Sequence, residues 1–188
     1  MEKTDDELII EYRNGNSDAF KELIERYIKP LFGFSYRMTG KKDLADDITQ
    51  ETCLKIWRKI SQYKTGSNTF KSWVFTIARN TTIDFLRKKK MPVISDFDTI
   101  DGHNYVTETT PDLDTLPSTL IEKAENKKLI DGALQTLSIE DKEILTLHYQ
   151  EELTFENIGT ILKKPLNTVK SRHRRALSKL KTYIEESP

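Results

Sequence analysis

The chain has 188 residues, of which 36% are apolar and 32% are charged, and it contains eight Phe, seven Tyr and two Trp. This amount of aromatic side chain can fill small hydrophobic cores, so the composition excludes a chain that is disordered throughout. The 30 basic and 30 acidic residues cancel, and the seven glycines are too few for a turn-rich β architecture.

Cellular location is constrained by three absences in the sequence. No run approaches the roughly 18 consecutive apolar residues that a membrane-spanning helix needs. The first residues carry no apolar signal region, and the single cysteine, Cys53, cannot form an internal disulfide. We therefore expect a cytoplasmic protein without membrane insertion, in a reducing compartment.

Apolar residues at helical spacing predict four helices in residues 1–92, over about residues 4–13, 17–39, 43–60 and 69–90. Ser17 or Asp18 is expected to cap the second helix, Pro30 is a candidate kink within it, and Gly40 ends it. The inward stripe of the third helix is predicted to be Ala45, Ile48, Thr52 and Ile56. That of the fourth is predicted to be Phe70, Trp73, Val74, Ile77, Thr81 and Phe85. These residues would form a first helical domain, closed by Pro92.

Residues 93–118 differ sharply from what precedes them. They hold six acidic residues, no Lys or Arg, two prolines and no periodic apolar face. The flanking segments are basic or nearly neutral, at net +5 for residues 1–92 and net +1 for residues 119–188. The zero net charge therefore hides a strong asymmetry, and residues 93–118 are predicted to be a flexible acidic linker.

Helical patterns resume in residues 119–188, with Thr119, Ser138 and Thr154 as predicted caps and Pro165 at the first position of the last helix. The inward stripe of that helix is predicted to be Val169, His173, Ala176, Leu177, Leu180 and Ile184. A short helix, a tight turn near Lys163 and a second helix predict a helix-turn-helix, whose second helix can enter the major groove of DNA. The predicted fold is all-α, with two small helical domains joined by the linker.

The last helix carries the strongest functional pattern. From Asn157 to Thr182 there are eight basic residues and no acidic one. The residues opposite its apolar stripe are Asn167, Thr168, Ser171, Arg174 and Arg175. Amide, hydroxyl and guanidinium groups can contact base edges, while flanking Lys and Arg neutralise phosphates. A solvated basic helix is the alternative, but the preceding helix and turn favour DNA binding.

The third helix has an acidic ridge on its outer side, formed by Asp43, Asp47, Gln50 and Glu51 around Leu54. Three interpretations stay open at this point: a solvated face, a docking surface for a basic partner helix, or a Mg²⁺ site of a nucleic-acid enzyme. The last is disfavoured because a metal site needs ligands that converge from separate elements.

The fourth helix and the loop before it combine basic, amide and aromatic residues. Arg79, Asn80, Ile83 and Arg87 share an outward face, and Lys64, Asn68, Phe70, Lys71 and Trp73 surround the start of the helix. Such a mixture suits single-stranded DNA, whose bases can stack and form hydrogen bonds. Core packing is the alternative for the two aromatic rings.

No cofactor, metal or catalytic centre is expected. The three histidines lack zinc-ligand spacing, and His148 and His173 fall on inward stripes, which favours core positions for both. The sequence has neither a phosphate-binding loop nor a nucleophile elbow.

These constellations, in this order, resemble an extracytoplasmic-function sigma factor of the bacterial sigma-70 family. The strings that carry the resemblance are DAFKEL at residues 18–23, LADDITQETCLKIW at 44–57, FKSWVFTIARN at 70–80 with DFLR at 84–87, and NTVKSR at 167–172. The resemblance implies a promoter-melting domain, region 2, at residues 1–92, the linker at 93–118, and a helix-turn-helix domain, region 4, at 119–188.

The resemblance also implies roles and partners. It implies that core RNA polymerase binds Asp47, Gln50 and Glu51. It also implies that the unpaired −10 strand binds Lys64, Asn68, Arg79, Asn80 and Arg87. It places the duplex −35 element on Asn167, Thr168, Lys170, Ser171, Arg172 and Arg175. The linker would thread the polymerase channel through which RNA passes, and an anti-sigma factor is an expected further partner. The implied function is a non-enzymatic transcription initiation factor; the alternative is a free-standing helix-turn-helix regulator.

Three positions depart from the family pattern. Lys163 and Asn167 stand where glycines are usual, so Lys163 must adopt the turn at some cost. Gly159 stands where alanine is usual, which we expect to weaken its helix by up to ~1 kcal/mol.

Overall fold

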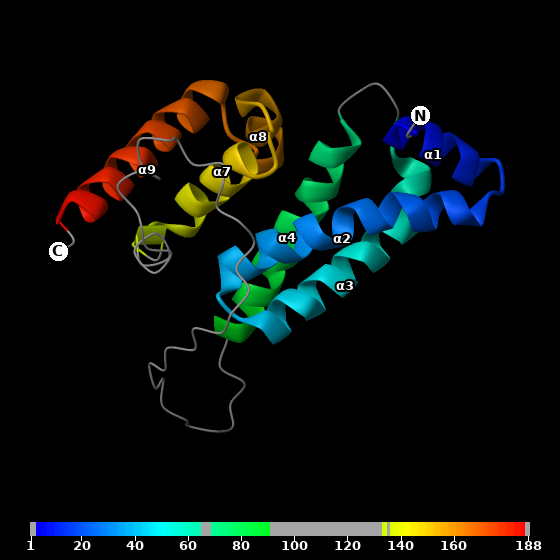
Figure 1. Cartoon of the computed structure of the whole chain (residues 1–188), viewed down its shortest axis with the longest axis horizontal. Coiled ribbons are helices and arrows are strands. Elements are labelled where there is room, and N and C mark those ends of the chain that lie inside the picture. The colour runs from blue at the N-terminus through cyan, green and yellow to red at the C-terminus, as the bar shows by residue number, and fades with distance from the viewer. Residues whose placement is uncertain (1–2, 65–68, 91–132, 135, 187–188) are drawn as a thin grey trace.

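The computed structural model describes residues 3–64, 69–90, 133, 134 and 136–186. Within these residues the chain is helical and contains no strand, which confirms the predicted all-α class. The helices are α1 (Asp5–Arg13), α2 (Ser17–Thr39), α3 (Lys42–Lys59), the short 3₁₀ helix η1 (Ile60–Gln62), α4 (Phe70–Lys90), α7 (Ile139–Tyr149), α8 (Phe155–Leu162) and α9 (Leu166–Glu186) (Figure 1). Pro92, the predicted linker at 93–118 and the predicted Thr119 cap lie outside the described residues.

The ends of the first two helices follow from local side-chain chemistry. Thr4 and Glu7 form a reciprocal capping box at the start of α1. The cap of α2 is Asn16, whose side chain accepts from the Asp18 amide at 3.2 Å, so the prediction of Ser17 or Asp18 was wrong by one or two positions. Asn offers the same acceptor chemistry as Ser and Asp, and the backbone places it outside the first turn. Gly40 ends α2, as predicted, and adopts the left-handed conformation.

Helices α1 to α4 form an N-terminal unit (Figure 1). Helices α2, α3 and α4 contact one another, and α1 packs on α2. The predicted stripe of α3 is buried throughout, at Ala45, Ile48, Thr52 and Ile56. In α4, Phe70, Val74, Ile77 and Thr81 are buried as predicted, while Trp73 and Phe85 are half-buried. Pro30 lies inside α2, which continues as one helix.

Helices α7, α8 and α9 form a C-terminal unit with the predicted helix-turn-helix. Ser138 caps α7 and Thr154 caps α8, as predicted. Pro165 was expected at the first helical position but lies just before α9, where its carbonyl accepts from the Val169 amide at 3.1 Å. A proline has no amide hydrogen to satisfy, so it suits either position at a helix start. The inward stripe of α9 is buried at Val169, Ala176, Leu180 and Ile184, while His173 and Leu177 are half-buried.

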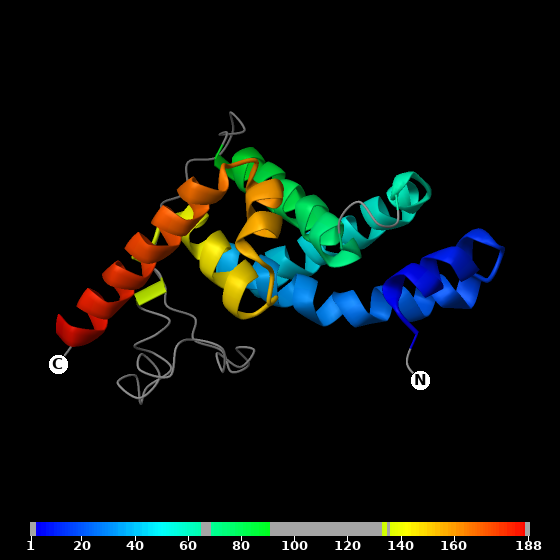
Figure 2. The same cartoon turned by 90° about the horizontal axis from the view of Figure 1, so that it is seen from above.

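The two units share a hydrophobic core. Helix α7 contacts α2, and α8 contacts α4, so that α9 lies on the far side of the C-terminal unit (Figure 2). Ile144, Leu147 and Ile158 belong to the same buried cluster as Phe34 and Phe75 of the N-terminal unit. A second, smaller cluster joins α7 to α9. The sequence analysis predicted two domains and made no prediction about whether they pack against each other.

Candidate nucleic-acid interface

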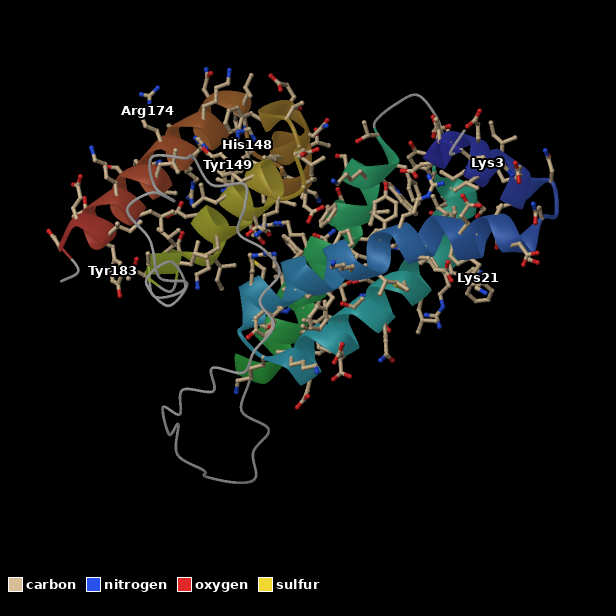
Figure 3. All side chains as sticks on the ribbon, viewed as in Figure 1. Lys3, Lys21, His148, Tyr149, Arg174 and Tyr183 are labelled. Atoms are coloured by element: carbon tan, nitrogen blue, oxygen red, sulfur yellow. The ribbon has the colours of Figure 1, made fainter. Side chains whose placement is uncertain are left out.

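The polar face of α9 is presented to solvent as the sequence predicts. Asn167, Lys170, Ser171 and Arg175 are exposed, whereas Thr168 and Arg172 are half-buried. Arg174 projects from the same helix away from the rest of the molecule (Figure 3). Because the apolar stripe anchors the opposite side of α9, this amide, hydroxyl and guanidinium face is free to approach a DNA groove.

Two acidic residues in the first turn of α7 orient basic side chains of α9. Arg172 contacts Glu140 and lies 3.8 Å from an oxygen of Asp141, and the Lys179 ammonium lies 3.3 Å from the other Asp141 oxygen. A recess of about 240 Å³ lies between these elements, lined by Ser138, Asp141, Arg172, Arg175 and Lys179. Three cationic groups therefore lie at one edge of the helix-turn-helix, and two of them, Arg172 and Lys179, are paired with carboxylates of α7.

The turn between α8 and α9 depends on Gly159 and Lys163. Lys163 adopts the left-handed conformation, with φ 53° and ψ 45°, at the position where the family usually has glycine. The Lys164 amide donates to the Gly159 carbonyl at 2.9 Å. A Cβ atom at residue 159 would lie 2.9 Å from the Lys164 carbonyl oxygen. The sequence interpretation considered only helix stability at Gly159, whereas an alanine there would also force the Lys164 backbone to shift.

His148 and His173 lie in a cluster of rings with Tyr149 and Phe155. Both histidines are half-buried, so they lie at the edge of the core that the sequence predicted for them. Figure 3 shows His148 and Tyr149 on α7, close to α9. The His148 Nδ1 lies 3.0 Å from the Leu153 carbonyl, and the His173 Nε2 lies 3.0 Å from the Tyr149 hydroxyl. Burial, assisted by the neighbouring His148, lowers the pKa of His173 below its usual 6.5.

This lowered pKa predicts acid sensitivity of the C-terminal unit. A depressed pKa means that the neutral imidazole stabilises the fold above about pH 6.5, the value for an unfolded chain, and that this contribution is lost as the pH falls through the folded-state pKa. We expect the free energy of unfolding in urea to fall between pH 7.5 and 5.5, and to fall less in His173→Gln. NMR titration of the His173 ring in the intact chain checks the cause: an inflection at or above 6.5 would contradict it.

The acidic ridge of α3 is exposed in its central part. Asp47 and Gln50 are exposed, while Glu51 is half-buried with an oxygen 3.6 Å from the Lys55 ammonium. Leu54 is 46% exposed, as predicted, and Trp57 is 53% exposed. Trp57 is not part of the predicted inward stripe, and its position three residues after Leu54 puts the two side chains on one face. Carboxylates and an amide therefore share one surface with two large exposed apolar groups, and apolar groups bordered by polar ones are a feature of protein interfaces.

The outward face of α4 is only partly available to a ligand. Asn80 and Arg87 are exposed, and Arg87 lies 3.3 Å from Asp84 of the same helix. Lys64 is exposed at the end of the described part of the preceding loop, whereas Asn68 lies outside the described residues. Phe70 is buried and stacks on the half-buried Trp73, so core packing is the better interpretation of both rings.

Arg79, predicted to bind DNA, is instead engaged by the C-terminal unit. Its Nε donates to the Glu143 carboxylate at 3.1 Å, and the two side chains are 15% and 1% exposed. The Lys71 ammonium lies 3.3 Å from the Glu151 carboxylate. Burial raises the pKa of both carboxyls, and the neighbouring cations oppose that rise. The pairing partners are 64 and 80 residues apart in sequence, so no local pattern pointed to them.

None of the helices in the described part of the chain has the length and apolar character needed to cross a membrane.

Comparisons with known proteins find a separate family model for each of the two helical units. Residues 23–91 match the family model for Sigma-70 region 2, and residues 133–182 match the model for Sigma-70, region 4. The ECF RNA polymerase sigma factor SigW of Bacillus subtilis is 28% identical over 180 residues, which cover 95% of each chain. The ECF RNA polymerase sigma-E factor of Haemophilus influenzae is 29% identical over 184 residues, covering 97% of this chain and 96% of that protein.

A solved structure of the sigma factor RpoE in complex with the anti-sigma factor NepR from Bartonella quintana is similar in fold. The TM-score is 0.65 with 25% sequence identity, and the match covers 90% of this chain and 98% of that one.

Proposed function

This chain belongs to the sigma-70 family of transcription initiation factors, and from that premise we propose that it binds core RNA polymerase and directs it to promoters that it recognises itself. It is similar over nearly its whole length to extracytoplasmic-function members of the family. The match of residues 23–91 to region 2 argues against the alternative, a free-standing helix-turn-helix regulator, because such a regulator has no use for a polymerase-binding and promoter-melting region.

Two chemically different surfaces in one chain support this function. The exposed face of α9, with Asn167, Lys170 and Arg175, suits duplex DNA, and we assign it to the −35 element. The α3 ridge, with Asp47, Gln50 and Glu51, suits a basic protein surface, and we assign it to core polymerase. The polar face of α4 around Asn80 and Arg87 is assigned to the unpaired −10 strand, together with Lys64 and with Asn68, which lies outside the described residues.

The division of the chain follows from these assignments. Residues 1–92 would act as region 2 and residues 119–188 as region 4, joined by the acidic segment 93–118. Each region alone would bind its DNA element weakly, and their attachment to one polymerase would raise the effective concentration of both. We assign no step of RNA synthesis to this chain and place its action in the cytoplasm. An anti-sigma factor is a proposed partner, since the similar Bartonella protein was solved in complex with one.

Run-off transcription tests the function. Core polymerase, a genomic library of promoter fragments and the purified chain are combined, and the start sites of the transcripts are compared with those made without the chain. Selective initiation at a shared pair of −35 and −10 sequences is expected. Transcripts that are no more selective than those of core polymerase alone would refute the proposal.

Asn80→Ala is expected to slow promoter opening by roughly tenfold, the order of a lost contact to one unpaired base. Asn80 is exposed on α4, so the change should leave the fold intact. Permanganate reactivity of the −10 thymines reports the opening, and the −35 footprint serves as the internal control. Normal reactivity would remove Asn80 from the strand-binding set.

Arg175→Ala is expected to weaken −35 occupancy by about tenfold, consistent with loss of one base or phosphate contact by an exposed arginine. If the contact is to a phosphate, the slope of log affinity against log salt should also decrease by roughly 0.9. Ser178→Ala, another exposed change on α9, is the matched control. An unaltered footprint would show that Arg175 does not contact the element.

A further inference from the structure

Three basic side chains along one side of α9 meet two carboxylates at the start of α7. The Lys164 ammonium, just before α9, lies 4.0 Å from one Glu140 oxygen, and the Arg172 guanidinium contacts the other. One Asp141 oxygen lies 3.8 Å from Arg172, and the second lies 3.3 Å from the Lys179 ammonium. Arg172 is therefore paired with both carboxylates, and it joins the first half of α9 to the first turn of α7.

Helix α7 itself holds the two carboxylates in place. Both belong to its first turn, where unpaired backbone amides and the helix dipole favour negative charge. The Asp141 amide donates to the Ser138 hydroxyl at 3.2 Å, and the Asp141 side chain is only 8% exposed. An exposed ion pair contributes little to stability, but a carboxylate as buried as Asp141 depends on its partners. The contacts to Asp141 therefore fix where α9 lies against α7.

The basic residues of α9 divide into two kinds. Lys170 and Arg175 are exposed, and the Arg175 guanidinium donates to the Ser171 carbonyl of its own helix at 3.4 Å. Arg172 is half-buried and faces α7. To reach a phosphate it would have to leave both carboxylates, and the buried Asp141 would lose one of its partners. Arg172 thus belongs to the packing of α9 on α7, whereas the exposed cations can meet DNA.

We propose that Arg172 is a positioning residue for −35 recognition: Glu140 and Asp141 hold it, and through it they fix the orientation of α9 without any contact between Arg172 and DNA. This inference rests on the proposed function, in which the exposed face of α9 reads the −35 element. It replaces the direct DNA contact that the family resemblance implied for Arg172. It also gives the carboxylates an unusual sign. A negative group near DNA repels phosphates, yet removing Glu140 should weaken binding, because α9 loses its orientation.

The test measures the affinity of the full chain, bound to core polymerase, for a labelled duplex. The duplex carries the −35 sequence shared by the promoters found in run-off transcription and ends before the −10 element. The variants are Arg172→Gln, Glu140→Gln and the two combined. Glu156→Gln removes an exposed glutamate at the same second position of α8 and is the control for a lost carboxylate. Lys170→Gln removes an exposed cation of α9 and is the reference for a lost DNA contact.

We expect Arg172→Gln and Glu140→Gln each to bind about five- to tenfold more weakly than wild type. The double variant should bind no more weakly than either, because all three lose the same contact. The slope of log affinity against log salt should stay unchanged in Arg172→Gln, whereas loss of one phosphate contact lowers it by roughly 0.9. Glu156→Gln should bind at least as tightly as wild type. A smaller slope in Arg172→Gln, or tighter binding by Glu140→Gln, would overturn the proposal.

Circular dichroism and urea unfolding verify that each variant is folded, and if Arg172→Gln is not, the sign of the Glu140→Gln effect decides. Duplexes with single base-pair changes in the −35 sequence separate a changed orientation from a loss of fold. A loss of fold lowers every affinity by the same factor, which would also overturn the proposal. A changed orientation of α9 should reduce the differences among the duplexes, because its base contacts are displaced.

Failure of the proposed function gives a different result. Wild-type chain on polymerase that binds a scrambled duplex as tightly as the −35 duplex would refute the assignment of α9 to that element, and the positioning role with it. Normal discrimination by the wild-type chain, together with a smaller salt slope in Arg172→Gln, would refute the positioning role alone.

Discussion

Replacing both Asp47 and Gln50 with alanine is expected to weaken binding to core RNA polymerase by roughly 100-fold, about 3 kcal/mol, which is the range for central interface residues. Both side chains are exposed and lie beside Leu54, which is also exposed. They have no structural role that the substitution would remove, so the free energy of unfolding should change by less than about 0.5 kcal/mol.

The measurement is a titration of labelled core polymerase with each protein. Asn14→Ala/Glu25→Ala removes one amide and one carboxylate from exposed positions outside α3 and should bind like wild type. If the variant of the ridge bound as tightly as this control, the α3 ridge would not be the polymerase-binding surface. The solvated-face interpretation of the ridge would then be the correct one.

Gly159→Ala is expected to destabilise the C-terminal unit by about 2 kcal/mol, although alanine is the better helix former. The added Cβ would lie 2.9 Å from the Lys164 carbonyl oxygen. That oxygen belongs to backbone that forms the turn between α8 and α9, so the clash can be relieved only by moving α9 relative to α8. The −35 footprint should weaken together with the fold.

Urea unfolding of the intact chain checks this expectation. Thr160→Ala, an exposed change at the next residue, is the control and should be close to neutral. Lys163→Gly should instead raise the free energy of unfolding by about 0.5 to 1 kcal/mol. Lys163 has a left-handed backbone conformation, and glycine adopts it without the steric cost that a Cβ atom carries. A Gly159→Ala protein as stable as wild type would mean that the turn has room for the methyl group.

Much of the fold could be predicted because its causes are local. The stripe of Ala45, Ile48 and Ile56 repeats at the period of a helix, and a helix at a protein surface buries such a stripe. Ser138 and Thr154 precede their helices at the spacing that lets a hydroxyl accept from the third amide beyond it. In these elements, the sequence pattern and the packing have the same period.

The availability of the candidate sites could not be predicted in the same way. Arg79 falls on the outward face of α4, but which acid meets it depends on how a segment 64 residues later packs. One local sign was present: Phe75 and Ala78 widen the apolar arc of α4 beyond the predicted stripe, and both are buried. A helix with so wide an apolar face packs against neighbours on two sides. Here α4 packs against α2 and α3 of its own unit and against α8 of the C-terminal unit.

The shared core has a consequence during synthesis. Residues 70–90 leave the ribosome well before Ile144, Leu147 and Ile158, which complete the cluster around Phe75. At roughly 5 to 20 residues per second, the first four helices wait several seconds for α7 and α8 to emerge. For that time the nascent chain displays an uncovered apolar face, so chaperone engagement should begin as α4 emerges and end as α8 docks.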